Sequence, residues 1–363
     1  VLASQSLANV DAAFKSLAGQ IPYRLVLASS ENDSRILLGE DNADAKLLTK
    51  AGEGILNAKG GAKEANQRFQ TAYWAPEERQ RILREVRALA VRDGFHRRPH
   101  VFEGNADVLA SDYEQAIFLS DGAGIAIPVG APMSMKPPVV TKFERGAGSN
   151  LLIVDGDGLG VLAVLLTSFL AQRVPVTAID FAAIEPEWEP VFDSLVEQGL
   201  KKVNRRRIEE VIDELLRDTA QRHAASEYRA EPRLLVLVGV HRAREFEPAD
   251  YGDEGLLSKV RQLAKDGPEV GIHLMAWADR KASLDRRFDS PLVKQFGLRL
   301  LGRMSEDDSR ALADGDQASR INAAQMVFDD LDKAVTLVVR RLGFPGVEWA
   351  QEIMGAGGDR REG

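Results

Sequence analysis

The stretch Leu151-Leu-Ile-Val-Asp-Gly-Asp-Gly-Leu-Gly-Val-Leu162 decides the fold. Its four leading apolar residues predict a buried strand over Leu151–Val154, glycines fill the turn that follows, and the apolar run Val161–Leu170 predicts a helix. A strand, a glycine turn and a helix N-terminus in this order are the layout of a phosphate-binding loop. We therefore expect a nucleotide-binding frame built around this turn.

The residues that would bind a nucleotide are absent from the turn. In the pattern Gly-x-x-x-x-Gly-Lys-Ser/Thr, Asp155 replaces the first glycine, Val161 the lysine and Leu162 the hydroxyl residue. No ammonium group reaches the phosphates, no hydroxyl holds Mg²⁺, and two aspartates would repel a triphosphate. The turn could still hold an anion on its backbone N–H groups, although a tight turn kept for packing is the plainer interpretation. The residues of this degenerate phosphate loop are Asp155, Gly156, Asp157, Gly158, Leu159, Gly160, Val161 and Leu162.

The composition is that of a soluble globular protein. The 363 residues are enough for two ordinary domains, with 44% hydrophobic and 28% charged residues. The formal net charge of −8 argues against nucleic-acid binding over the whole surface, and a local basic stripe stays possible. The chain has no cysteine, and its five histidines are not spaced as zinc ligands, so we expect no disulfide and no metal site. We see no signal peptide or membrane span and expect a cytoplasmic protein.

Strands and helices are predicted to alternate along the second half of the chain. The continuous apolar run Leu234–Val240 is typical of a central parallel strand. Near the N-terminus, Val1–Ala3 and Tyr23–Ala28 predict short buried strands, and a helical stretch is expected to end at Ala51. The other predictions are strands at Ile125–Val129, Val139–Thr141, Val176–Phe181 and Gly271–Ala278, and helices at Asp11–Gly19, Glu77–Arg92, Arg205–His223 and Leu256–Lys265.

A motif near the N-terminus recurs near the C-terminus. Ser30-Glu-Asn-Asp-Ser-Arg35 returns 275 residues later as Ser305-Glu-Asp-Asp-Ser-Arg310, and at this offset Ala43 lies over Ala318. Each copy ends in a predicted hairpin, at residues 54–73 in the first and 326–341 in the second. We interpret the chain as the C-terminal end of one domain followed by a whole second copy. The strand-like start suggests a fragment of a longer protein.

Four motifs of the first copy carry a family resemblance. Leu2-Ala-Ser-Gln5 is similar to a strand ending in Leu-Ala-Thr-Gln, and Val10-Asp11, Ile21-Pro-Tyr-Arg24 and Asp33-Ser-Arg-Ile-Leu-Leu38 follow it in order. With this order and spacing, the first copy resembles the C-terminal part of the FtsK/SpoIIIE motor domain. The resemblance covers residues 1–75 well and residues 140–345 more weakly.

This resemblance implies an α/β fold of the RecA-like P-loop NTPase type with a mainly parallel sheet. Members of the family work as hexameric ATP-driven translocases. Most move double-stranded DNA, whereas the related type VII secretion ATPases move protein and carry several such domains in tandem. ATP and Mg²⁺ would be cofactors of the full-length motor. The implied organisation is a motor-domain end at 1–75, a helical linker at 76–120, a degenerate ATPase domain at 121–354 and a disordered tail at 355–363.

The second copy has also lost its catalytic acids. In the family, an apolar strand is followed by an Asp that holds Mg²⁺ and a Glu that activates the attacking water. After Arg233 and the apolar run Leu234–Val238, Gly239 and Val240 stand in those two places. Gln5 of the first copy would sense the γ-phosphate or simply be a hydrogen-bonded loop residue, and its counterpart near Ala278–Asp279 is lost. We therefore expect little or no hydrolysis in the second copy.

Arg24 and Arg35 are the candidates for arginine fingers at a subunit boundary. The alternative is a structural ion pair, because Asp33 lies beside Arg35 in the sequence. Arginine persists at both matching positions of the second copy, Arg299 and Arg310, although that copy has lost its chemistry. This persistence favours a role in holding the fold.

Three basic clusters could contact phosphate or a partner. Arg97-Arg98 and the run from Lys201 to Arg207 are more simply solvated faces, because acidic residues follow the second one at once. His241-Arg242-Ala-Arg244 follows the strand that has lost its acids, at the sheet edge where such folds bind ligands. It is the better candidate for a functional or docking cluster.

Three functions compete. The leading one is the C-terminal region of an ATP-driven DNA translocase that assembles into a ring, with a last domain that regulates or assembles it. The second is a protein-export motor whose degenerate domain docks a secreted protein substrate. The third is a scaffold without enzymatic activity.

Overall fold

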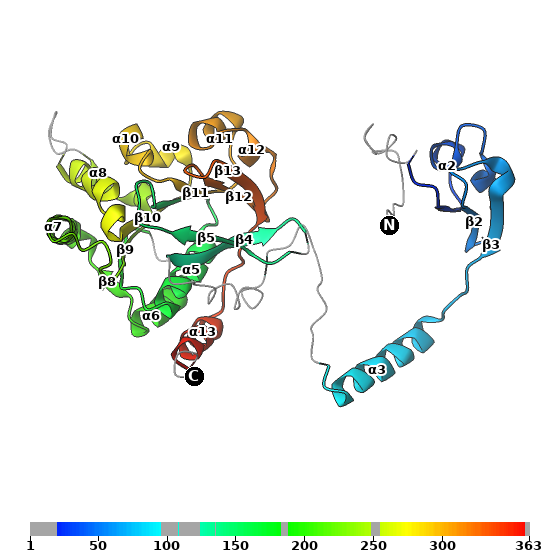
Figure 1. Cartoon of the computed structure of the whole chain (residues 1–363), viewed down its shortest axis with the longest axis horizontal. Helices are drawn as coiled ribbons and strands as arrows, with labels where there is room; N and C mark the ends of the chain where they lie inside the picture. Colours follow the sequence, from blue (N-terminus) through cyan, green and yellow to red (C-terminus); the bar gives the residue numbers. More distant parts are fainter. Residues whose placement is uncertain are drawn as a thin grey trace. The chain divides into compact units, whose positions relative to one another are not determined.

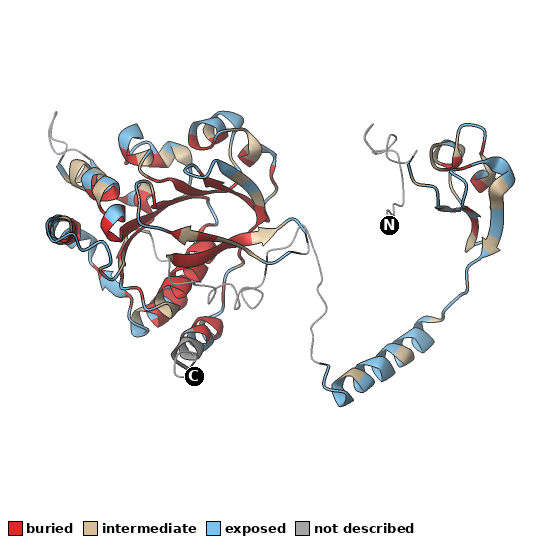
Figure 2. Ribbon diagram, in the orientation of Figure 1, coloured by how far each residue is buried: buried red, intermediate tan, exposed pale blue. Residues whose placement is uncertain are grey.

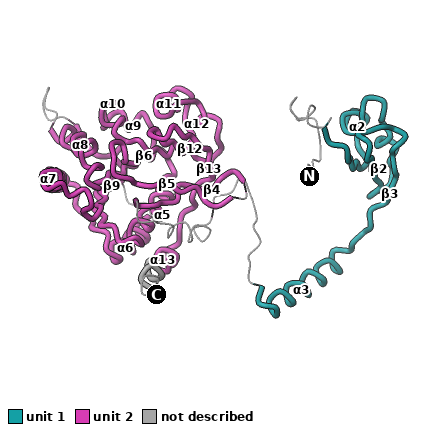
Figure 3. The backbone as a smooth tube through the Cα atoms, in the orientation of Figure 1, with its two compact units in different colours: residues 1–99 teal, residues 100–363 magenta. Residues whose placement is uncertain are grey.

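The computed structural model divides into two compact units, residues 1–99 and 100–363, which are described separately (Figure 3). Gln5, residues 1–3 and the predicted helix at 11–19 lie outside the described residues, as do Arg97 and Arg98. The structure describes residues 20–95, 108, 124–134, 136–182, 188–247 and 255–359, with side chains as far as residue 353.

Unit 1 is a small sheet with helices. Its three strands pair antiparallel in the order β1-β2-β3. A small core joins the sheet to the first helix through five buried side chains, Val26, Leu38, Ala45, Leu48 and Ile55. The elements are β1 (Arg24–Leu27), α2 (Glu31–Leu38), η1 (Asp44–Leu47), β2 (Glu53–Asn57), η2 (Lys63–Ala65), β3 (Asn66–Gln70) and α3 (Pro76–Arg92).

Two sequence predictions for unit 1 were wrong. The strand at 23–28 is not buried, because Leu25 and Leu27 are 62% and 49% exposed. The helix expected to reach Ala51 ends at Leu38, where Gly39 takes a φ of 126° that glycine adopts most readily. The chain continues from there into the short helix η1. The hairpin predicted over 54–73 is present as β2 and β3.

The helix α3 matches its prediction to within one residue. It starts with Pro76, whose missing N–H costs nothing in the first turn, and Glu77 and Glu78 favour the same end. No residue of α3 is buried, and Leu83 and Val86 are both more than half exposed (Figure 2). Its apolar stripe is therefore uncovered by the other described residues of the unit.

A mixed sheet organises unit 2, whose ten described strands follow the order β5-β4-β13-β12-β11-β6-β10-β9-β7-β8. The run from β11 to β8 is parallel, and the run from β11 to β5 is antiparallel. The strands are β4 (Ile125–Pro132), β5 (Val139–Phe143), β6 (Leu151–Val154), β7 (Val176–Asp180), β8 (Lys201–Val203), β9 (Arg233–Val238), β10 (Ile272–Ala278), β11 (Leu298–Leu301), β12 (Gln325–Asp330) and β13 (Val335–Arg340).

Helices cover both faces of this sheet. The first core cluster holds α5, α6 and α13 against one face, and the second holds α7, α8 and the short helices α9 to α11 against the other (Figure 1). The helices are α5 (Leu159–Ala171), α6 (Trp188–Glu197), α7 (Ile208–Ala224), α8 (Gly255–Asp266), α9 (Lys281–Leu284), α10 (Ser290–Val293), α11 (Glu306–Leu312), α12 (Gln317–Arg320) and α13 (Val347–Asp359), with single turns η4 (Arg205–Arg207), η5 (Val240–Arg242), η6 (Arg244–Phe246) and η7 (Pro268–Val270).

Two details differ from the sequence predictions for unit 2. The apolar run expected as a strand to Val240 ends at Val238, and Val240 starts the turn η5. The tail expected to be disordered from 355 is helical as far as Asp359, because α13 continues through it. The mainly parallel α/β architecture itself was predicted correctly.

The order of the strands brings the loops after β6 and β9 to the same edge of the sheet. Strand β10 lies between β6 and β9, with Met275 opposite both Leu151 and Val236. Because these strands are parallel, their carboxyl ends and the loops that follow them meet at one edge of the sheet. The degenerate phosphate loop after β6 and the lost acid pair after β9 therefore share that edge.

The internal repeat has a structural counterpart. The elements β1, α2, β2 and β3 of unit 1 match β11, α11, β12 and β13 of unit 2 in order and pairing, with Arg24 opposite Asn57 in one and Arg299 opposite Asp329 in the other. A buried serine of the first helix ties the turn after it in each copy. Ser34 Oγ accepts from the N–H of Ala45 at 3.2 Å, and Ser309 Oγ accepts from that of Ala318 at 3.2 Å. Ala318 therefore corresponds to Ala45, and its predicted match with residue 43 was wrong by two positions.

Candidate functional site

The degenerate phosphate loop is a tight turn. The N–H of Gly158 donates to the carbonyl of Asp155 at 3.3 Å, and α5 begins at the next residue. A backbone nest for an anion needs residues in the left-handed region, but Gly158 has a φ of −71°, and neither Gly156 nor Gly160 has a positive φ. The loop therefore lacks the conformation of the anion-holding nest considered from its sequence.

Two glycines of the loop allow close packing. A Cβ atom at Gly158 would lie 2.5 Å from Nε1 of Trp277, and one at Gly160 would lie 3.0 Å from the backbone of Phe344. Gly156, in contrast, has open space where a Cβ would stand. The glycines that made the sequence look like a phosphate loop thus accept β10 on one side and the segment after β13 on the other.

Arg341 is bound to the loop and was missed by the sequence prediction. Its Nη2 lies 3.0 Å and 2.9 Å from the two carboxylate oxygens of Asp155, and its Nη1 lies 3.2 Å from Asp157. The side chains of Arg341 and Asp155 are 8% and 7% exposed, whereas that of Asp157 is 82% exposed. Only the end of the predicted hairpin at 326–341 hinted at this residue, since its partner is 186 residues away in the sequence.

The buried carboxylate has opposing influences on its charge. Burial raises the pKa of Asp155, while the Arg341 guanidinium and the N–H of Asp157 lower it. The backbone carbonyl of the same residue accepts from Nε1 of Trp277 at 2.8 Å. The backbone carbonyl and Oδ1 of Asp155 thus accept hydrogen bonds inside the protein, whereas the buried Oδ2 has only the ion-pair contact with Arg341.

The place of the lost acid pair has a backbone unsuited to an acid. Gly239 has a φ of 75°, and a Cβ there would lie 2.9 Å from the backbone nitrogen of Ala182. Val240 is completely buried. The nearby acid at the end of β7, Asp180, accepts from the N–H of Ala182 at 2.9 Å, and burial raises its pKa.

His241 connects the loops after β9 and β10. Its Nδ1 accepts from the N–H of Asp279 at 3.2 Å, and its ring meets the Trp277 ring edge-to-face at 5.4 Å. Burial lowers the pKa of His241. Arg242 and Arg244, the other members of the predicted cluster, are exposed at the same edge. This contact lies near Ala278–Asp279, where the sequence predicts the counterpart of Gln5.

Arg24 holds the fold of unit 1. Its Nε donates to the carbonyl of Ile21 at 3.1 Å and its Nη1 to that of Leu37 at 2.9 Å. Arg299 donates to the carbonyls at the same relative positions, three residues before it and thirteen after it. The same contacts in both copies indicate that this arginine ties the strand to the end of the following helix.

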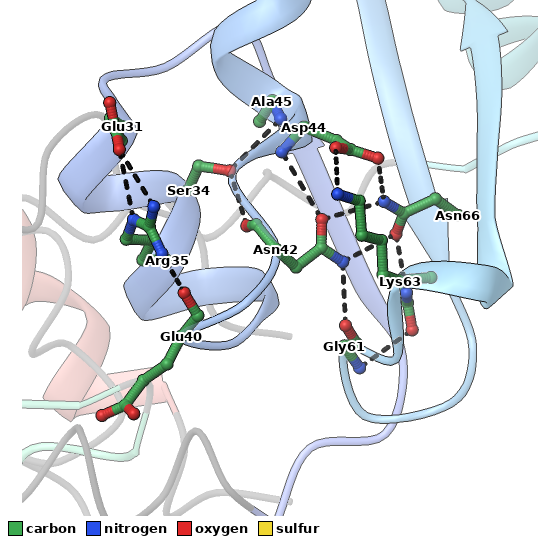
Figure 4. A network of polar contacts seen from close by, with 11 residues as sticks. Glu31, Ser34, Arg35, Glu40, Asn42, Asp44, Ala45, Gly61, Lys63 and Asn66 are labelled. Atoms are coloured by element: carbon green, nitrogen blue, oxygen red, sulfur yellow. Dashed lines mark hydrogen bonds and ion pairs between the residues drawn. The ribbon is translucent and has the colours of Figure 1, made fainter.

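Arg35 lies in an ion-pair network on the surface of α2 (Figure 4). It pairs with Glu31 at 3.0 Å and donates to the carbonyl of Glu40, while Asp33, its expected partner, bonds to the helix-capping serine instead. Arg310 pairs with the glutamate four residues before it in the same way. Beside Arg35, Figure 4 shows a second polar network that holds the turns of unit 1 together through Asn42, Asp44, Gly61, Lys63 and Asn66.

The basic run at 201–207 is partly neutralised. Arg205 pairs with Glu245 at 3.3 Å and Arg207 with Glu210 at 2.8 Å, while the ammonium of Lys202 lies 5.0 Å from the Phe192 ring centre. Among the described residues, no cluster of His, Asp or Glu is arranged to hold a metal ion. The described helices include none that combines the length and the apolar character needed to cross a membrane.

Comparisons with known proteins identify the fold. No protein-family model and no curated protein matches the chain. Among solved structures, the pCW3 conjugation coupling protein TcpA, in its monomer form with ATPγS, is 14% identical with a TM-score of 0.54 over 70% of this chain and 75% of that chain. The cytoplasmic domain of the type VII secretion ATPase EccC from Thermomonospora curvata is 19% identical with a TM-score of 0.52. The chain has a RecA-like ATPase fold.

The EccC comparison also shows the extent of the similarity. It covers 97% of this chain but 45% of the EccC chain, so this chain spans less than half of that protein's length. Both structures are of the kind that the sequence resemblance indicated. At these sequence identities, the likeness shows a shared fold.

Proposed function

We propose that the chain is the C-terminal region of an FtsK/SpoIIIE-type translocase, in which unit 1 is the end of a motor domain and unit 2 is an ATPase-like module that does not hydrolyse ATP. The observation that carries this proposal is the turn after β9. Gly239 has a left-handed backbone there, and Ala182 leaves no room for a side chain. A carboxylate that would hold Mg²⁺ cannot be placed at this position without moving the backbone.

The loop after β6 supports the same proposal. Hydrolysis needs a cation at the transferred phosphate, and the lysine place is held by the buried Val161. The buried cation that reaches this loop, Arg341 from the end of β13, is already bound by Asp155. Unit 2 therefore has the frame of a motor domain without the groups that stabilise the charge of phosphoryl transfer, which fits a regulatory or assembly role in the ring.

The test is ATP hydrolysis by the purified chain with Mg²⁺. We expect no release of phosphate above the buffer blank. Asp180 lies opposite Val238, the residue before Gly239, so Asp180→Asn serves as the matched variant. Saturable turnover by the wild-type chain that is lost in Asp180→Asn would overturn the proposal, because it would show that this acid has replaced the missing one.

The cargo separates two versions of the proposal. The leading one is duplex DNA, for which binding by the protein that carries this chain should weaken steeply as salt rises, since phosphate contacts release counterions. The alternative is protein export, with unit 2 docking a secreted protein substrate. It is favoured by the similarity to EccC over 97% of this chain. Binding of a secreted substrate without salt-sensitive DNA binding would select export.

A scaffold without any enzymatic role is the third version. It predicts that the protein that carries this chain has no ATPase activity at all, whereas both motor versions place hydrolysis in the domain to which unit 1 belongs. In the motor versions, the full-length protein binds ATP and Mg²⁺ in its intact motor domain. It also assembles into a ring, which is a hexamer in the leading version. Hydrolysis by that protein would therefore exclude the scaffold.

A further inference from the structure

The Asp155–Arg341 pair is unusual among the ion pairs that the structure describes, because both side chains are more than nine-tenths buried. Removing two charges from water is costly, and such a pair persists where further contacts fix both partners. Here Arg341 is fixed by its backbone, which donates to the carbonyl of Ala324 at 2.8 Å and accepts from Val108 at 3.0 Å. The backbone carbonyl of Asp155 accepts from Nε1 of Trp277, and its backbone N–H donates to the carbonyl of Ala278 at 3.0 Å.

The surroundings make room for this carboxylate in particular. A Cβ atom at Gly302, the first residue after β11, would lie 2.2 Å from a carboxylate oxygen of Asp155. On the outer side, Phe344 runs over Gly160 at the start of α5, and the N–H of Gly343 donates to the carbonyl of Val108 at 2.9 Å. The residues Arg341–Phe344, which we call the strap, therefore pack against the loop.

We propose that the Asp155 carboxylate is a built-in substitute for a bound phosphate, with Arg341 as its cation, so that this edge of unit 2 is ordered without any nucleotide. The carboxylate is an oxyanion held by a guanidinium, which is a donor that proteins use for phosphate. The strap delivers the cation from the end of β13, where a motor loop would use its own lysine.

This inference rests on the proposed function and adds a latent site to it. If the carboxylate is removed, the guanidinium of Arg341 stays buried beside the loop without its partner. The vacated place then has the chemistry of a site for a small oxyanion. An added anion of suitable size should bind there and restore the lost stability, because ligands that bind the folded state stabilise it.

The test is thermal unfolding of the whole chain carrying Asp155→Gly, with chloride, formate or inorganic phosphate at equal ionic strength. Formate matches the carboxylate that was removed, and phosphate is the ligand class that the proposal names. We expect phosphate to raise the melting temperature of the unit 2 transition by about 3 °C or more relative to chloride, and the wild type to show no such rise. Asp155→Ser is the second variant, in case the glycine variant does not fold.

Two controls make the outcome decisive. Asp155→Gly combined with Arg341→Met removes the cation too, and phosphate should then have no effect. Asp218→Asn leaves another buried arginine, Arg222, without its acid at 2.9 Å, but far from the loop, and it should not respond to phosphate. A response in either control would show a general effect of anions and overturn the proposal.

Rescue by formate alone would also overturn it, because the pair would then be an ordinary buried ion pair with no room for phosphate. No rescue by either anion has the same consequence. These outcomes are separate from the fate of the proposed function. Failure of the rescue without ATP turnover removes the phosphate substitute and leaves the inactive module, whereas turnover by the wild type removes the inactive module itself.

Discussion

At the scale of single residues, the contact between Asp155 and Arg341 decides how the loop is held. In the sequence, Asp155 stands where the phosphate-loop pattern has its first glycine. In the structure, it is the acid of a buried ion pair. Its partner could not be found from the sequence, because no local pattern connects positions that are 186 residues apart. Gly239 and Val240 could be named from the sequence, because the apolar strand before them marks where the resembled family places its acid pair, and their role stays a prediction.

The ion pair leads to a double-mutant prediction. We expect Asp155→Asn and Arg341→Met each to lower the free energy of unfolding of unit 2 by about 3–5 kcal/mol, because each leaves an uncompensated buried group. The double variant should lose much less than the sum of the two. Urea unfolding followed by tryptophan fluorescence measures the cycle. The exposed pair Arg81–Glu85 is the control, and its loss should cost less than about 1 kcal/mol. Additive losses at the buried pair would contradict the prediction.

His273 gives a pH prediction. It is 1% exposed, its Nδ1 donates to the carbonyl of Ser149 at 2.8 Å, and burial lowers its pKa to about 4. A lowered histidine pKa means that the unfolded state binds the proton more tightly. The contribution of the neutral His273 side chain to the free energy of unfolding is therefore complete above about pH 6.5. It is lost as the pH falls toward 4, and the total loss is about 3 kcal/mol.

The measurement for His273 is the free energy of unfolding of unit 2 between pH 7 and pH 4. His273→Gln keeps a polar side chain but cannot gain a charge, so its stability should fall less over this range than that of the wild type. Equal slopes for the two proteins would show that another group controls the acid sensitivity.

At the scale of elements, the phosphate-loop glycines turn out to serve packing. We expect Gly158→Ala to destabilise unit 2 by about 1–3 kcal/mol, because the new methyl group would overlap Nε1 of Trp277 at 2.5 Å. Gly156→Ala is the matched control two residues away, where the space is open and φ is not positive. It should change stability by less than about 1 kcal/mol. Similar losses in both variants, measured by urea unfolding, would contradict the packing role.

The repeat makes a prediction that links two elements. Ser34 and Ser309 bridge α2 and α11 to the turns that follow them with matching hydrogen bonds. Replacing either serine by alanine leaves buried backbone groups without a partner and should cost about 1–3 kcal/mol in its own unit. Ser283→Ala, at an exposed contact to Arg280, is the control and should cost less than about 0.5 kcal/mol. A loss in only one of the two units would show that the copies differ at this point.

The sequence predicted most elements of unit 2 to within a few residues, because long apolar strands and periodic helices carry strong local signals. Val176–Asp180 and Ile272–Ala278 are examples. It failed at β1, where an apolar pattern was taken to mean burial although Leu25 is exposed. It also failed at residues 355–359, where a glycine- and charge-rich composition was taken to indicate disorder. The contacts of Arg341 and Trp277 with the loop depend on tertiary packing, which no local pattern contains.

At the scale of the whole molecule, the two copies of the repeat have different surroundings. In unit 2, β11 pairs with β6. The loop after β6 is held by the ion pair between Asp155 and Arg341, the first residue of the strap. This arrangement needs no nucleotide to be ordered. Under the proposed function, unit 2 would keep its shape while the intact motor domains of the ring bind and hydrolyse ATP.

The most direct test of this self-sufficient site is the thermal unfolding of unit 2 in the whole chain with and without saturating Mg²⁺·ATP. The carboxylate of Asp155 is already bound to Arg341, and Gly239 and Val240 stand where the acid pair would hold Mg²⁺ and activate water. We therefore predict the same melting temperature in both conditions. A saturable rise with ATP that disappears in Arg341→Met would contradict it, since the nucleotide would then be using the cation that the structure assigns to Asp155.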